Sequence, residues 1–185
     1  RPAGAAAPAA KDGAKRRMGE NGLPVGSRIV GGPVTRGFDY FWGCSNARTM
    51  SGLIENDRVI ENLPPIEMLP RLGRQAVKYV AERASAARAG RPFFLYLPHF
   101  GVHSPFQAKP ELVAKFKGKP GAGGHNSPTY AAMIASVDES VGRVMAKLAE
   151  LKLADDTVFI FASDNGGVGG YAREGLTKGG GGDVT

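Results

Sequence analysis

The 185-residue sequence contains a single cysteine, Cys44, and a single tryptophan, Trp42. One cysteine excludes a disulfide within the chain and leaves its redox compartment open. No apolar run approaches the length needed to cross a bilayer, and no signal peptide is visible. The chain begins with Arg1, so the lack of a leader does not assign it to the cytoplasm. The sequence therefore predicts neither a disulfide-stabilised scaffold nor a membrane protein.

Acidic residues are scarce, with 17 against 24 basic ones, which gives a net charge of +7. Such a balance can indicate a nucleic-acid partner. However, the basic cluster of Lys11, Lys15, Arg16 and Arg17 lies in an Ala/Gly/Pro-rich leader without aromatic residues. Proteins that bind RNA or single strands usually supply stacking aromatics beside the charge. We therefore predict no nucleic-acid partner, and a flexible, basic, low-complexity insertion over residues 1–24.

Apolar residues at helical spacing predict three helices. The first runs from Ile66 to Ala89 and ends at Gly90, and a short one follows from Pro110 to Phe116. A long amphipathic helix begins at Pro128, and its polar face carries a Glu139–Arg143 pair four residues apart.

Two apolar runs, Phe93–Leu97 and Thr157–Phe161, are typical of buried strands, and residues 52–61 favour a short strand or hairpin. A strand, a helix and a strand in this order predict a right-handed βαβ crossover in a parallel sheet. The predicted fold class is thus α/β, with a βαβ unit at residues 93–161.

An acid and an amide, Asp164 and Asn165, follow the second predicted strand directly and lead into a glycine-rich loop. Open α/β sheets bind ligands at the carboxyl ends of their strands, and oxygen-bearing side chains suit calcium or magnesium. Taken alone, Asp-Asn-Gly is also an ordinary turn former, so the pattern by itself allows either interpretation.

Three blocks in a fixed order extend this pattern, and a weaker match over Arg36–Gly43 and Ile54–Asp57 precedes them. The three blocks are Arg91–Pro98 with Val102-His103-Ser104-Pro105, Tyr130–Ile134 continuing through Val137–Gly142, and Phe161–Gly166. Together they resemble the sulfatase family over roughly residues 25–170.

The resemblance implies a partial parallel-sheet sandwich of the alkaline phosphatase/sulfatase type, with residues 25–170 as part of the catalytic domain. Residues 171–185 are then expected to be a truncated, glycine-rich loop. The family's formylglycine motif is absent, so we expect an internal fragment. The resemblance alone favours a periplasmic or secreted location. Without neighbouring strands, the edges of the βαβ unit should be open and its apolar surface exposed.

In the chemistry that the resemblance implies, Asp164 and Asn165 are ligands of a divalent cation, with calcium favoured over magnesium. His103 would assist the leaving alcohol of a sulfate ester. The formylglycine nucleophile is expected outside this chain, as is its partner, a formylglycine-generating or sulfatase-maturing enzyme. The expected substrate is a sulfated small molecule or carbohydrate. The alternatives are a phosphoester or phosphonate hydrolase of the same superfamily and a non-catalytic fragment that binds a metal or a partner.

Two further residues partly match sequence motifs of the family. Cys44 lies four residues before Arg48, the spacing of the formylglycine motif, but Asn46 replaces the motif's proline. Lys178 lies too close to Asp164 to match the family's later lysine. We therefore predict that Cys44 is a small, semi-buried residue and that Lys178 is a solvated loop residue.

Overall fold

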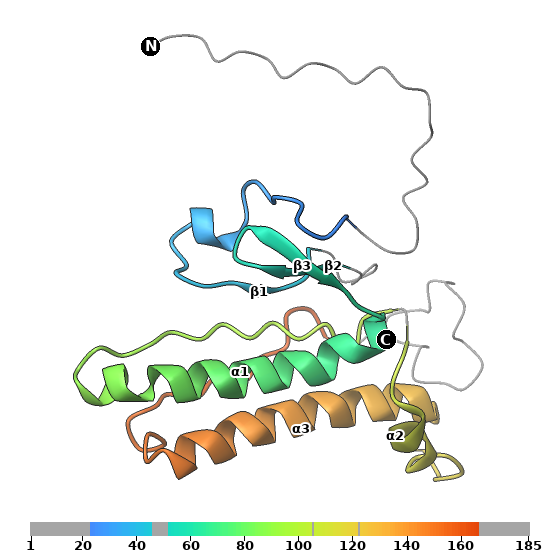
Figure 1. Ribbon diagram of the computed structural model, residues 1–185. Coiled ribbons are helices and arrows are strands. Elements are labelled where there is room, and N and C mark those ends of the chain that lie inside the picture. The colour runs from blue at the N-terminus through green and yellow to red at the C-terminus, as the bar shows by residue number, and fades with distance from the viewer. Residues whose placement is uncertain (1–22, 46–51, 105, 122, 167–185) are drawn as a thin grey trace, which may run out of the picture.

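The computed structural model describes residues 23–45, 52–104, 106–121 and 123–166 (Figure 1). A three-stranded sheet lies beside a layer of helices, which agrees with the predicted α/β class. The elements in chain order are the 3-10 turn Pro33–Thr35, β1 Trp42–Gly43, β2 Gly52–Glu55, β3 Arg58–Asn62, α1 Pro65–Arg88, α2 Pro110–Ala114 and α3 Pro128–Glu150.

The sheet is antiparallel and has the order β1-β2-β3. Its β2–β3 hairpin confirms the strand signal at residues 52–61. The chain reverses through Asn56, which adopts a left-handed φ of 55°, a conformation that asparagine tolerates well. Leu53 and Val59 are each only 1% exposed, and they turn the apolar face of the hairpin toward the core.

Helix α1 begins and ends within one residue of the predicted helix. Pro65 occupies the first turn, where its missing N–H has no partner to lose, and Gly90 ends the run with a φ of +78°. One face of the helix is buried. That face comprises Met68, Leu69, Leu72, Gly73, Ala76, Val80 and Ala84.

Helix α3 packs along α1, and the two share a core (Figure 1). The Ser127 hydroxyl caps α3 by accepting a hydrogen bond from the Tyr130 amide at 3.3 Å. The predicted Glu139–Arg143 pair is present, with Nε 3.2 Å from Oε1. Helix α2 is two residues shorter than predicted. The shared core consists of Ala76, Val80, Ala84, Val144, Leu148 and Leu153.

The parallel strands predicted at Phe93–Leu97 and Thr157–Phe161 are not formed. Within the described ranges, neither segment belongs to a sheet, and no backbone hydrogen bond joins one to the other. Both nevertheless run back along the helices that precede them, and in the same direction, as the two strands of a βαβ unit would (Figure 1).

The two segments also differ from the predicted burial on both faces. Phe93, Leu95 and Leu97 pack on the α1–α3 core, whereas Phe94 and Tyr96 are 75% and 66% exposed. The second segment is more open, since Val158 is 87% and Ile160 81% exposed. A central strand needs a hydrogen-bonded neighbour on each edge and a cover on each face, and the described residues supply only the cover of the helix layer. The exposed apolar surface predicted around this unit is confirmed.

Candidate functional site

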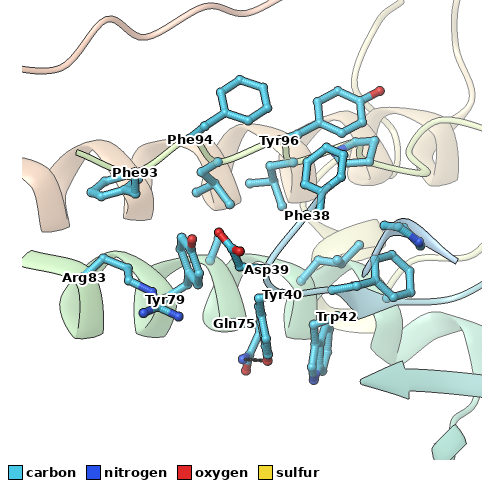
Figure 2. A pocket seen from close by; sticks show the side chains of 18 of the residues that line it. Phe38, Asp39, Tyr40, Trp42, Gln75, Tyr79, Arg83, Phe93, Phe94 and Tyr96 are labelled. Carbon is cyan, nitrogen blue, oxygen red and sulfur yellow. Dashed lines mark hydrogen bonds between the residues drawn. The ribbon is translucent and has the colours of Figure 1, made fainter. Parts of the chain in front are cut away.

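A cleft of about 840 Å³ lies between the loop before β1, helix α1 and the segment 91–100 (Figure 2). Its walls are dominated by aromatic rings, and three arginines against one aspartate give it a basic rim. The aromatic lining is Phe38, Tyr40, Phe41, Trp42, Tyr79, Phe93, Phe94, Tyr96 and Phe100, and the charged lining is Arg36, Asp39, Arg83 and Arg91.

Ring contacts connect the three walls of the cleft. Tyr40 stacks on Tyr79 of α1 with centroids 5.8 Å apart, and the Tyr79 ring meets Phe93 edge-on at 6.1 Å. The Arg83 guanidinium lies 5.1 Å from the Tyr79 ring centroid, within the range of a cation–π interaction. Phe38 and Phe94 approach at the outer edge of the cleft, with their rings 6.3 Å apart.

Tyr40 also ties the sheet to α1 through its hydroxyl. The hydroxyl accepts from Gln75 of α1 at 2.7 Å (Figure 2). It donates to Glu55 of β2, also at 2.7 Å. Burial, and then the neighbouring Glu55 carboxylate, raise the pKa of the Tyr40 hydroxyl far above its ordinary value. Tyr40 therefore remains a neutral donor throughout the physiological range.

His99 brings a buried polar group to the same cleft. Both ring nitrogens are inaccessible to solvent and have no hydrogen-bond partner. Burial lowers the pKa of this imidazole below its ordinary value of 6.5, because the charged form loses its hydration. Its environment favours a neutral ring.

Asp164 and Asn165 lie together at the end of the Thr157–Phe161 segment, and both are exposed. Asp164 accepts hydrogen bonds from the Asn165 backbone amide at 2.9 Å and from the Asn165 side-chain nitrogen at 3.2 Å. Ser163 accepts from Gly166, whose φ of +78° lets the backbone turn sharply. The geometry is thus an acid–amide turn that presents oxygen atoms to solvent.

His103 lies in the turn between segment 91–100 and α2, and its side chain is exposed. Its Nδ1 atom is hydrogen-bonded to the Ser104 carbonyl oxygen, and its amide donates to the Phe100 carbonyl. A carbonyl can only accept, so Nδ1 carries a proton and Nε2 is left as the second ring nitrogen. That atom is the one available to an incoming group.

The structure brings Asp164 and Asn165 together but records no hydrogen bond or ion pair between them and His103. Neither site lines the aromatic cleft. A carboxylate and an amide suit a hard cation chemically, yet such ions take six or more oxygens. Within the described part of the chain, no three His, Cys, Asp or Glu side chains gather as metal ligands do. The Asp164–Asn165 pair therefore fits a cation as part of a larger ligand set.

Cys44 is half-buried and packs against the cluster around Leu53, Met68 and Leu72. This is the small, semi-buried position predicted for it. Lys178 and the basic leader up to residue 22 lie outside the described residues. No described helix has the length and apolar character needed to span a membrane.

Comparison with known proteins places these segments within a single family match. The family model described as Sulfatase matches residues 17–182. The chain belongs to the sulfatase family. That match includes the acid–amide turn, the His103 turn and the aromatic cleft, so all three are features of a sulfatase chain.

Individual relatives agree with the family match. A sulfatase of Formosa agariphila is 34% identical over 56% of this chain, and an N-acetylgalactosamine-6-O-sulfatase of Bacteroides thetaiotaomicron is 40% identical over 42%. The matches span only 20% and 13% of those relatives. The solved structure of Ps i-CgsB in complex with k-i-k-neocarrahexaose aligns with a TM-score of 0.55 at 26% identity, over 68% of this chain and 32% of that one. This sulfatase chain therefore spans about a fifth of the length of the first of these relatives.

Sequence reasoning missed the aromatic cleft and the unpartnered imidazole of His99. The Arg36–Gly43 block contains the aromatic residues that line one wall, so its composition was a usable signal. No local pattern could show that this block faces α1 and segment 91–100, because those contacts join residues more than thirty positions apart.

Proposed function

We propose that the protein to which this sulfatase chain belongs hydrolyses sulfate monoesters. The observation that carries this proposal is the exposed acid–amide turn of Asp164 and Asn165 inside the matched family region. Its oxygen atoms would supply two ligands to a divalent cation, calcium in preference to magnesium. When bound there, such a cation would neutralise sulfate oxygens.

His103 is proposed to act on the leaving group. With Nδ1 held by the Ser104 carbonyl, the exposed Nε2 atom is free to hold a proton for the departing alcohol oxygen. The formylglycine nucleophile and the remaining ligands are proposed to come from residues beyond this chain. The sequence has no cysteine or serine followed by proline and arginine at the motif's spacing.

A sulfated carbohydrate is the proposed substrate class. Two comparisons support it, since one relative is named an N-acetylgalactosamine-6-O-sulfatase and the aligned solved structure is a complex with k-i-k-neocarrahexaose.

The test uses the full-length protein and a sulfated sugar, with Asp164→Ala compared with Asp138→Ala on the exposed face of α3. Asp164→Ala should abolish cation-dependent turnover and weaken calcium binding measured by calorimetry, because it removes a charged ligand. Asp138→Ala should retain both. Undiminished turnover and calcium binding in Asp164→Ala would refute the ligand role.

His103→Ala separates leaving-group assistance from binding. A lost general acid should lower kcat by about 10²–10⁴-fold for a sugar sulfate, and much less for an aryl sulfate whose phenol leaves easily. Equal losses on both substrates would contradict the proposed role.

A further inference from the structure

Lysines gather in the segment that follows the His103 turn. Between His103 and Asp138 the sequence has four lysines and a single acid, Glu111. One of the lysines, Lys109, is half-buried, and the other three are exposed. The exposed three are Lys115, Lys117 and Lys119. These four residues, called the lysine surface below, give a positive charge to the chain directly after the residue proposed to assist the leaving group.

The charge of the lysine surface is not neutralised within the described residues. Five ion pairs join side chains there, and none includes a lysine of this surface. On α1, by contrast, Lys78 pairs with Glu82. Lysine is almost never fully buried unless it is paired, so this surface suits water or an anion and not a covering apolar strand. Clustered charges of one sign attract ligands of the opposite charge.

Packing and hydrogen bonds hold the segment that carries these lysines. Helix α2 packs on α3 at the end of the helix layer where α3 begins (Figure 1). Before α2, the Phe106 ring meets Tyr130 of α3 edge-on, with ring centroids 5.7 Å apart. After α2, the Lys117 amide donates to the Val113 carbonyl at 3.1 Å. The lysines are therefore presented from a supported turn.

Lys119 is the most restrained of the exposed lysines. Its amide donates to the Phe116 carbonyl at 3.1 Å, and its Nζ atom lies 5.1 Å from the Phe116 ring centroid. That distance is within the range of a cation–π interaction. A side chain that is already ordered loses less freedom when a ligand binds, which favours affinity.

A ligand with several anionic groups matches this arrangement. Each lysine ammonium is a compact point charge that pairs with anionic oxygens, and a carbohydrate can carry a sulfate on more than one sugar. Six fully extended residues span at most about 22 Å, so Lys109 lies within an oligosaccharide's length of a sulfate held at His103.

We propose that the lysine surface binds additional sulfate groups of a carbohydrate whose scissile sulfate is held at His103. Multiply sulfated oligosaccharides are then the preferred substrates. This inference rests on the proposed function and narrows its substrate class. Because the attraction is between exposed charges, the preference should weaken at high ionic strength, where the screening length falls from about 8 Å to about 3 Å.

The test compares two hexasaccharides as substrates of the full-length protein. One carries a sulfate on every second sugar, and the other carries a sulfate only on the sugar that is hydrolysed. Lys115→Gln with Lys117→Gln should lower the ratio of kcat/KM for the first over the second by about three- to tenfold, through KM, because exposed charge pairs are individually weak. The matched variant, Lys78→Gln with Lys147→Gln, removes the same charge from α1 and α3 and should keep the ratio of the unmodified protein.

Calorimetric binding in the Asp164→Ala background separates this inference from the proposed function, because it requires no turnover. If the protein hydrolyses neither hexasaccharide, yet Lys115→Gln with Lys117→Gln weakens binding of the multiply sulfated one, the lysine surface is supported and the hydrolase proposal fails. Equal binding of both hexasaccharides before substitution would overturn the inference. So would an equal loss in the matched variant, or equally tight binding of a single-stranded DNA oligonucleotide of the same charge.

Discussion

Two side chains in the described structure have buried polar atoms without hydrogen-bond partners, the His99 imidazole and the Ser140 hydroxyl. A buried polar group without a hydrogen bond destabilises the folded state, so His99 and Ser140 are each expected to lower the stability of the chain. The sequence patterns predicted neither of these unpartnered groups. Ser140 lies where α3 meets Gly73 of α1, a contact that local sequence patterns do not describe.

Acidification should destabilise the fold through His99. Its folded-state pKa lies below the ordinary 6.5, so between the two pKa values the unfolded chain binds more protons than the folded one. The stability that His99 contributes is complete above pH 6.5 and falls as the pH drops toward the folded pKa. Thermal unfolding measured from pH 8 to pH 5 should show this decline.

His99→Leu is the matched variant, because leucine fills similar space without titrating. Its melting temperature should fall less between pH 7 and pH 5 than that of the unmodified chain. Identical slopes for the unmodified chain and His99→Leu would show that His99 is not the group responsible.

At the scale of elements, α1 and α3 approach each other closely at Gly73. A Cβ atom added there would lie 2.5 Å from the Ser140 hydroxyl oxygen and 3.0 Å from its Cβ. The absent side chain therefore allows the helices to meet, although glycine in a helix interior costs about 1 kcal/mol relative to alanine.

Gly73→Ala should destabilise the chain despite the gain in helix propensity. Overpacking costs about 1–3 kcal/mol, which exceeds or cancels the propensity gain of about 1 kcal/mol. Gly142→Ala on α3 is the matched control, since a Cβ there meets nothing within 4 Å. It should stabilise the chain by up to about 1 kcal/mol in urea unfolding. Equal effects of the two substitutions would contradict the close-contact explanation.

The elements differ in how well the sequence predicts them. Helix α1 was placed within one residue at both ends and α3 at its first residue, because caps, glycine and apolar periodicity are local signals. Phe93–Leu97 and Thr157–Phe161 were predicted from equally local signals, yet strand formation requires hydrogen-bonded neighbours elsewhere. The same residues thus have the composition of central strands and the exposure of open edges.

At the scale of the whole molecule, this chain alone should not hydrolyse sulfate esters and should bind calcium poorly. Asp164 and Asn165 offer two oxygen-bearing side chains, whereas calcium takes six to eight ligands. Calorimetric titration with calcium and an assay with a chromogenic aryl sulfate test this. Metal-dependent turnover by the isolated chain would show the expectation to be wrong.

The roles of Asp164, Asn165 and His103 remain predictions, because the described residues record no contact between the acid–amide pair and His103. The acid–amide pair was foreseen because its members are adjacent in sequence, and its geometry follows from a tight turn. The relation of that pair to His103 depends on how the strands align, and the described residues contain no ladder that sets this alignment. The aromatic cleft depends on contacts between distant segments in the same way.

The only tryptophan of the chain, Trp42, lies in the wall of that cleft. Its indole fluorescence therefore reports on one defined place without competing emission from another tryptophan. Any group that fills the cleft removes water from the ring and should shift its emission to shorter wavelength, whereas events at the acid–amide turn, which does not line the cleft, should leave it unaltered. The molecule thus carries an optical reporter that follows cleft filling in real time without an added label.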